Sequence, residues 1–153
     1  MQESAHSRNV TACAVWPAVL WTAVVFLADR ATKLFFFSQT LVPADSIVTL
    51  VHHENRGALG NLPVPQPAII LLTVIVIGFI IRVIRTSAMH GRSRQIIALG
   101  ILLGGAFGNL FDRMIHGYVF DWILLFGQSA INLADIAVVV GVLWYAWERR
   151  TTS

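Results

Sequence analysis

The chain has 153 residues, enough for one compact domain, and 56% of them are hydrophobic while only 12% are charged. An ordinary soluble domain carries roughly 25% charged residues. A soluble protein of this size could not cover its surface with so few charged residues. The pI of about 9.8 does not indicate nucleic-acid binding, because the basic residues lie in short clusters between apolar runs. This composition predicts an integral membrane protein.

Four apolar runs follow one another along the chain, at approximately residues 10–36, 67–85, 95–112 and 129–147. Each is close to the length needed to cross about 30 Å of hydrocarbon. The first is too long for a typical signal-peptide core, so no cleavable targeting segment is expected. We predict a single domain over residues 1–153, of the all-α membrane class, with four transmembrane helices.

Between the first two runs, Ile47–Val51 is rich in β-branched residues, which predicts a strand, and a Pro-rich stretch leads into the second helix. We therefore expect a small β-rich element on the extracytoplasmic side. The connection between the second and third runs, over residues 85–94, is short and basic.

Basic residues indicate the orientation of these helices. With the N-terminus inside, seven basic residues fall on the cytoplasmic side and four on the outer side. The inner set is Arg8, Arg82, Arg85, Arg92, Arg94, Arg149 and Arg150, and the outer set is Arg30, Lys33, Arg56 and Arg113. Short loops rich in Lys and Arg stay inside, so both termini are expected to be cytoplasmic.

Carboxyl groups gather on the opposite, outer side of the predicted membrane. Six of them fall there: Asp29, Asp45, Glu54, Asp112, Asp121 and Asp135. Asp135 is the sharpest of these, because it is placed about two turns inside the fourth run, where a charge needs a partner or a polar cavity. Asn132 precedes it by three residues, which predicts that both lie on one helical face.

Asp121 lies in the short connection before the fourth run and alone would be a solvated loop carboxylate. If it faces Asp135, however, the two carboxyl groups cannot both ionise easily, so one keeps a proton while the other acts as a base. Such a pair can activate water and protonate a leaving amine, which is the chemistry of amide hydrolysis.

Two further groups have structural as well as functional interpretations. Gly100, Gly104 and Gly108 recur every four residues, a spacing typical of close helix packing, while Gly105, Asn109, Asp112 and Arg113 share another face. That polar face either orders a site or anchors the helix at the interface. Asp29 and Lys33, four residues apart, either pair near the site or serve as interfacial anchors.

Other chemistries find little support in the sequence. His52, His53 and Glu54 make a metal site conceivable, but adjacent strand residues point to opposite faces, so we predict no metal and no cofactor. The lone Cys13 is expected to be an inert buried residue. There is no phosphate loop and no Gly-x-Ser-x-Gly motif.

Taken together, the motifs resemble signal peptidase II, the bacterial lipoprotein signal peptidase, over nearly the whole chain and in the right order. The matching segments are Asp29–Lys33, Asn55-Arg56-Gly57-Ala58, GGAFGNLFDR with GYVFDWI, and Asn132-Leu133-Ala134-Asp135. The chain departs from the family after Ala58, where Leu59-Gly60-Asn61-Leu62 stands in place of a segment with an aromatic residue.

The resemblance implies an aspartic endopeptidase that removes the signal peptide from prolipoproteins, cutting before the diacylglyceryl-modified cysteine. Asp121 and Asp135 would be the catalytic pair. The supporting residues would be Asp29, Lys33, Asn55, Gly57, Asn109, Asp112, Arg113 and Asn132. It also implies a monomer in the bacterial inner membrane, with prolipoproteins and membrane lipids as partners and the active site near the outer face.

Two other functions remain open from the residues alone. A proton- or ion-coupled transporter would use Asp135 as its carrier, although no repeat or broken helix supports it. A non-enzymatic membrane scaffold would use the glycine stripe as a docking face, which leaves the outer carboxyl groups unexplained.

Overall fold

A computed structural model describes residues 2–39, 47–57 and 64–151, with residues 2–13 described by their backbone alone. Four helices and a small sheet follow in the order α1 (Gln2–Phe37), β1 (Val48–Asn55), α2 (Gln66–Met89), α3 (Ser93–Ile115), β2 (Val119–Leu125), β3 (Ser129–Ile131) and α4 (Leu133–Thr151). Ala58, the Leu59–Leu62 segment, Asp45 and the side chains of Arg8 and Cys13 lie outside the described residues.

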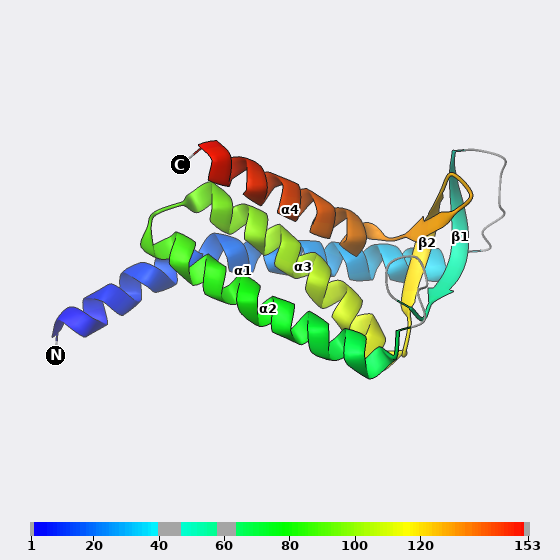
Figure 1. Ribbon diagram of the computed structural model, residues 1–153, viewed down its shortest axis with the longest axis horizontal. Helices are drawn as coiled ribbons and strands as arrows, with labels where there is room; N and C mark the ends of the chain where they lie inside the picture. The colour runs from blue at the N-terminus through cyan, green and yellow to red at the C-terminus, as the bar shows by residue number, and fades with distance from the viewer. Residues whose placement is uncertain (1, 40–46, 58–63, 152–153) are drawn as a thin grey trace.

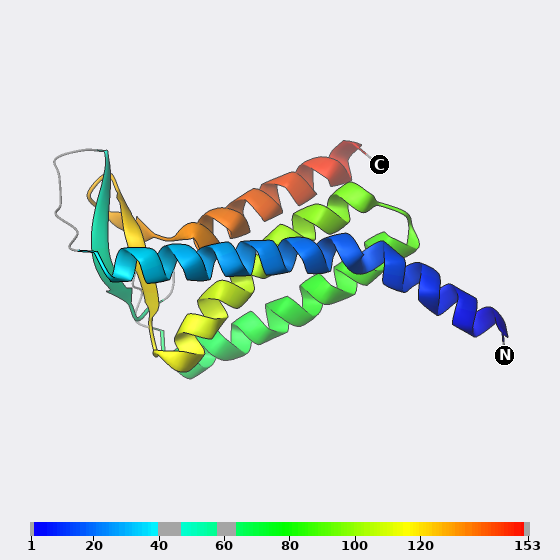
Figure 2. The same cartoon turned by 180° about the vertical axis from the view of Figure 1, so that it is seen from behind.

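The helices form an elongated bundle, and the sheet covers one end of it (Figure 1). Helix α3 packs against the other three helices. Helix α1 begins and α4 ends at the end of the bundle away from the sheet, as the two opposite views show (Figures 1 and 2). The chain therefore has a sheet-bearing end, where the predicted outer residues gather, and an opposite end with both termini.

The predicted helices are confirmed, with shifted boundaries. Within the part of the chain that the structure describes, three segments are long and apolar enough to cross a membrane: Ala14–Phe37 of α1, Gln66–Met89 and Ser93–Ile115. Helix α4 has 19 residues, but it contains Asp135 near its start and Glu148, Arg149 and Arg150 near its end, so a fourth span is not confirmed on composition. Pro67 lies in the first turn of α2, where its missing N–H removes no helical hydrogen bond.

The interior between the helices is apolar. Its centre is a cluster on α2 and α3 that includes Ile77, Ile80, Ile84, Ile96, Leu99 and Leu103. The glycine stripe on α3 packs as predicted: a Cβ on Gly100 would lie 2.7 Å from the backbone oxygen of Ala18 on α1. The absence of a side chain there allows the backbones of α1 and α3 to touch.

The predicted strand exists but extends further than expected, from Val48 to Asn55. It pairs antiparallel with β2, which pairs antiparallel with β3, in the order β1-β2-β3. A register irregularity between Leu50 and His53 interrupts the first pairing. The sheet is fixed to the end of α1, where Phe36 stacks on Trp122 with ring centroids 4.0 Å apart.

Three expectations about residues 119–135 were wrong. The segment before α4 is a hairpin and not a loop, because its β-branched and aromatic residues pair with β1 and its turn passes through Gly127 with φ of 65°. The fourth helix accordingly begins at Leu133 rather than near residue 129, since Ser129–Ile131 form a strand. Asp135 thus lies in the first turn of α4, not two turns inside it.

Candidate active site

Asp121 lies on β2, at the point where the sheet meets the helices, and its side chain is completely buried. One carboxylate oxygen accepts a hydrogen bond of 2.6 Å from Asn132 Nδ2, and the other accepts one of 3.0 Å from Asn55 Nδ2. Burial, together with the nearby charge of Asp135, raises the pKa of Asp121 to about 7, although the two amide donors act in the opposite direction. Asp121 therefore holds a proton in a large fraction of molecules near neutral pH.

Asp135 is held at the start of α4 by a reciprocal cap. Its carboxylate accepts a hydrogen bond from the backbone N–H of Asn132 at 3.1 Å, while its own N–H donates to Asn132 Oδ1 at 3.0 Å. This arrangement corresponds to a capping box, in which both partners satisfy backbone groups at a helix start. Asn132 and Asp135 therefore do not share a helical face as expected, because Asn132 precedes the helix and caps it.

Two asparagines join the aspartates. Asn109 on α3 donates to Asp135 Oδ1 at 2.7 Å. Asn132, which is fully buried, donates from the same amide nitrogen to Asp121 and, at 3.2 Å, to Asn109 Oδ1. The two carboxyl groups thus belong to one hydrogen-bonded unit built from β2, α3 and α4.

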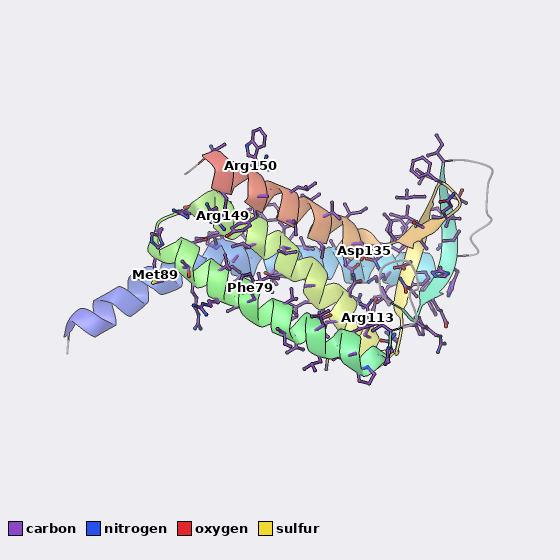
Figure 3. The ribbon with its side chains drawn as sticks, in the orientation of Figure 1. Phe79, Met89, Arg113, Asp135, Arg149 and Arg150 are labelled. Atoms are coloured by element: carbon purple, nitrogen blue, oxygen red, sulfur yellow. The ribbon has the colours of Figure 1, made fainter. Side chains whose placement is uncertain are left out.

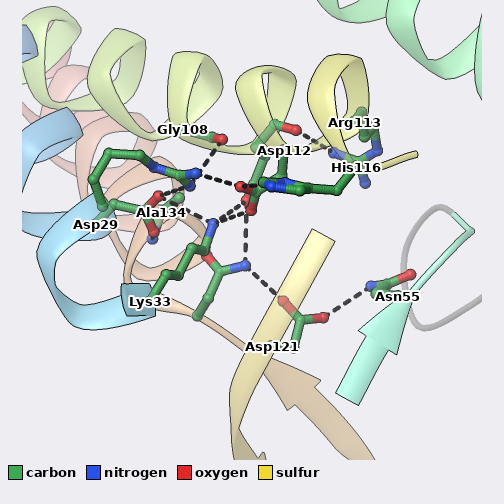
Figure 4. A network of polar contacts seen from close by, with 12 residues as sticks. Asp29, Lys33, Asn55, Gly108, Asp112, Arg113, His116, Asp121 and Ala134 are labelled. Atoms are coloured by element: carbon green, nitrogen blue, oxygen red, sulfur yellow. Dashed lines mark hydrogen bonds and ion pairs between the residues drawn. The ribbon is translucent and has the colours of Figure 1, made fainter. Parts of the chain in front are cut away.

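A second cluster, of four charged residues, lies directly beside this unit (Figure 4). Lys33 Nζ lies 3.0 Å from Asp29 Oδ2 and 2.7 Å from Asp112 Oδ2, and Arg30 also bonds to both aspartates. Asp29, Lys33 and Asp112 are at most 5% exposed. Anchoring at an exposed interface does not explain such burial, which favours the pairing of Asp29 with Lys33 near the site.

The charged cluster is attached to the aspartate unit at two points. Lys33 Nζ donates to Asn109 Oδ1 at 3.3 Å. Asp29 Oδ1 accepts the backbone N–H of Ala134 at 3.1 Å, so a carboxylate from α1 caps the first turn of α4. Asp29 therefore helps to fix the helix start that carries Asp135.

Gly108 makes this capping geometry possible. Its carbonyl oxygen accepts a hydrogen bond from Arg30 at 3.2 Å, and a Cβ at this position would lie only 2.7 Å from Asp29 Oδ2. Any side chain on residue 108 would therefore disturb the contact between Asp29 and the start of α4.

Gly57 and Arg113 hold the end of β1 against α3. Arg113 donates to the carbonyl oxygen of Gly57 at 3.3 Å, and the N–H of Gly57 donates to Asn55 Oδ1 at 3.1 Å. Asn55 in turn donates to Asp121. Arg113 therefore supports the catalytic candidate through two intermediates rather than through direct contact.

A continuous network of polar contacts consequently joins all ten residues singled out in the sequence. They are Asp29, Lys33, Asn55, Gly57, Asn109, Asp112, Arg113, Asp121, Asn132 and Asp135. The arrangement places a carboxyl pair in a low-dielectric setting with its amide donors already in place, which suits acid–base chemistry on an amide.

Sequence reasoning missed Arg30, which it counted only as an outer charge. Its guanidinium bonds to Asp29, Asp112 and the Gly108 carbonyl, and it lies 5.0 Å from the ring centroid of Phe111. Its place beside Asp29 in the chain was a signal. Its partners on α3, however, lie about 80 residues away, and no sequence spacing links them.

His52 makes aromatic contacts, its ring lying 4.9 Å from that of Phe37 and 4.7 Å from that of Phe120. Among the residues that the structure describes, no three His, Cys, Asp or Glu side chains form a group suited to a metal ion.

Comparison with known proteins identifies the family. The family model described as signal peptidase (SPase) II matches residues 21–149. The chain belongs to the signal peptidase II family. The predicted peptidase function is thereby confirmed, and the transporter alternative receives no support.

Individual relatives of this signal peptidase II agree with the family match. A lipoprotein signal peptidase of Shouchella clausii is 41% identical over 132 residues, covering 82% of this chain and 87% of the relative. One of Halothermothrix orenii is 33% identical over 135 residues, covering 82% and 92%. A solved structure of a bacterial membrane enzyme has a TM-score of 0.71 at 20% identity and covers 83% of each chain, so it supports the fold.

Proposed function

We propose that this signal peptidase II cleaves prolipoproteins immediately before the diacylglyceryl-modified cysteine, with Asp121 and Asp135 as the catalytic residues. The observation that carries this proposal is that hydrogen bonds of Asn132 and Asn109 link the two carboxyl groups. The substrate combines an apolar signal peptide with acyl chains, so an enzyme for it has to hold its site near the level of the lipid headgroups.

The pair works with one proton between its two carboxyl groups. The ionised carboxylate takes a proton from water as the water oxygen attacks the scissile carbonyl carbon. The other carboxyl supplies a proton to the reacting amide, whose C–N bond breaks and releases the amine of the lipidated cysteine. The raised pKa of Asp121, about 7, favours the singly protonated pair near neutral pH.

The supporting residues have positioning roles in this mechanism. Asn132 and Asn109 orient the carboxylates, and Asn55 with Gly57 and Arg113 holds the β1 side of the site. The charged cluster around Asp29, Lys33 and Asp112 fixes α1, α3 and the start of α4 relative to one another. None of these residues needs to touch the scissile bond.

We further propose that α4 is the fourth span of a monomeric, single-domain protein of the bacterial inner membrane. Its 19 residues extend about 28 Å at 1.5 Å per residue, and its charges lie near its ends, where snorkelling to the interface is possible. The sheet and the aspartates would face outward, and both termini would lie in the cytoplasm, in keeping with the distribution of basic residues.

A cleavage assay tests the catalytic proposal. A diacylglyceryl-modified prolipoprotein in detergent or lipid vesicles is incubated with the wild type, Asp121→Asn and Asp135→Asn, and cleavage is followed by gel shift. We expect each variant to lose activity by at least about 1,000-fold while remaining folded, because asparagine keeps the shape but cannot exchange the proton.

Glu54→Gln is the matched control, since Glu54 is an exposed carboxylate on β1 that pairs with Arg56 outside the network. It should cleave like the wild type. Cleavage by either aspartate variant at more than about a tenth of the wild-type rate would exclude that residue as catalytic.

Labelling with a membrane-impermeant maleimide in spheroplasts tests the membrane placement. Three exposed positions are replaced by cysteine in a Cys13→Ala background: His90 between α2 and α3, Gln128 at the hairpin tip, and Thr151 at the end of α4. Gln128→Cys should be labelled at once, and the other two only after permeabilisation. Immediate labelling of Thr151→Cys would show that α4 does not cross.

A further inference from the structure

A cleft lies on the side of the molecule at the end away from the sheet, where α2, α3 and α4 meet. Its volume is about 230 Å³. It is lined by Phe79, Arg82, Val83, Thr86, Ser87, Arg92, Gln95, Tyr145 and Arg149. It shares no residue with the aspartate site, and Figure 3 shows Arg149 at the far end of the molecule from Asp135.

The cleft is strongly basic. Arg82 comes from α2, Arg92 immediately precedes α3, and Arg149 lies in the last turn of α4, so three separate segments each contribute a guanidinium. No acidic side chain is among the described residues that line it. Guanidinium groups bind phosphate oxygens with paired hydrogen bonds. Tyr145, which also lines the cleft, carries a further hydroxyl donor.

One wall of the cleft continues as an apolar strip along α2. Phe79 and Val83 line the cleft, and Leu72, Ile75 and Val76 follow on the same helical face toward the sheet-bearing end. Phe79, Leu72 and Ile75 are 66%, 62% and 59% exposed. A free phosphate would use only the basic part, whereas a phospholipid would use the basic part and the strip together.

We propose that this cleft binds the phosphate headgroup of an anionic membrane phospholipid, with one acyl chain lying along the Leu72–Phe79 face of α2. Basic pockets between membrane helices on the cytoplasmic side are suited to anionic headgroups. The site lies at the level of the cytoplasmic leaflet in the proposed orientation. It does not depend on the peptidase chemistry, and loss of one would leave the other intact.

Native mass spectrometry of the full-length protein tests this proposal. The protein in detergent is titrated with phosphatidylglycerol, and with phosphatidylcholine as a zwitterionic lipid of the same chain length. The test variant is Arg82→Gln/Arg92→Gln/Arg149→Gln. The matched control is Arg85→Gln/Arg94→Gln/Arg150→Gln, which removes three positive charges from the same end of the molecule but none that lines the cleft.

We expect the wild type to bind one phosphatidylglycerol at least about tenfold more tightly than phosphatidylcholine. The cleft variant should lose this preference, and the control variant should keep it within about twofold. Phe79→Ser should also weaken the binding of phosphatidylglycerol, because it interrupts the apolar strip without changing the charge.

Three results would overturn the proposal. Equal losses in the two triple variants would mean that general positive charge attracts the lipid. An unchanged cleft variant would place the lipid elsewhere. Displacement of phosphatidylglycerol by an equal concentration of glycerol phosphate would show that the site recognises a free phosphate and that the α2 strip contributes nothing.

Discussion

Replacing Gly108 by alanine should loosen the junction between α1, α3 and α4 on which the site depends. The new Cβ would lie 2.7 Å from Asp29 Oδ2 and 3.2 Å from the Cβ of Ala134. Asp29 cannot easily yield, because it is fully buried and held by Arg30 at 2.6 Å, Lys33 at 3.0 Å and the Ala134 N–H at 3.1 Å. The helices themselves would have to separate.

The expected loss of stability follows from these contacts. Overpacking of a close-packed site destabilises by about 1–3 kcal/mol, and a weakened cap at α4 adds about 1 kcal/mol. Alanine's better helix propensity offsets up to about 1 kcal/mol. The net decrease in the free energy of unfolding should therefore be about 2 kcal/mol, or roughly a 30-fold change in the unfolding equilibrium.

The assay is unfolding in mixed micelles by a rising fraction of dodecyl sulfate, followed by circular dichroism, with cleavage activity measured in parallel. Gly78→Ala is the matched control, since no atom lies within 4 Å of a Cβ at that position on α2. It should leave stability unchanged or slightly higher. If Gly108→Ala proves as stable and as active as Gly78→Ala, the close approach of α3 to Asp29 is not what holds the site.

Three further predictions concern the polar network. Cleavage should fall as the pH rises through about 7, because Asp121 then loses its proton, and Asn55→Ala should move this alkaline limb upward, since it removes a donor that favours the ionised carboxylate. The measurement is a pH–rate profile, and a shift of the alkaline limb of Asn55→Ala to lower pH would contradict the assignment of this limb to Asp121. Lys33→Met should destabilise by about 3–5 kcal/mol, because it leaves buried carboxylates short of positive charge, and adding Asp112→Asn should recover part of that loss in a double-mutant cycle. Asn132→Ala should lower the cleavage rate by about 100-fold and the free energy of unfolding by about 1–2 kcal/mol. Loss of the helix cap alone would lower stability without such a fall in cleavage.

Much of the helical architecture could be predicted from the chain alone, for a simple reason. The bilayer requires long apolar runs, and such runs are visible in composition without knowledge of any contact. The same holds for the glycine stripe on α3, because its four-residue spacing is a local property of one helix. The ten candidate site residues were identified through motifs of four to ten consecutive residues, whose identities are local as well.

The tertiary structure decided what those residues do for one another. Sequence spacing placed Asp135 inside a helix and Asp121 in a loop, whereas pairing with β1 turns residues 119–131 into a hairpin and brings Asp135 to the first turn of α4. Arg30 and Gly108 gained their importance only from the approach of α1 to α3 across about 80 residues of chain. Helix periodicity is set within a few residues, but burial of a charge and the identity of its partner depend on segments that meet only in the folded protein.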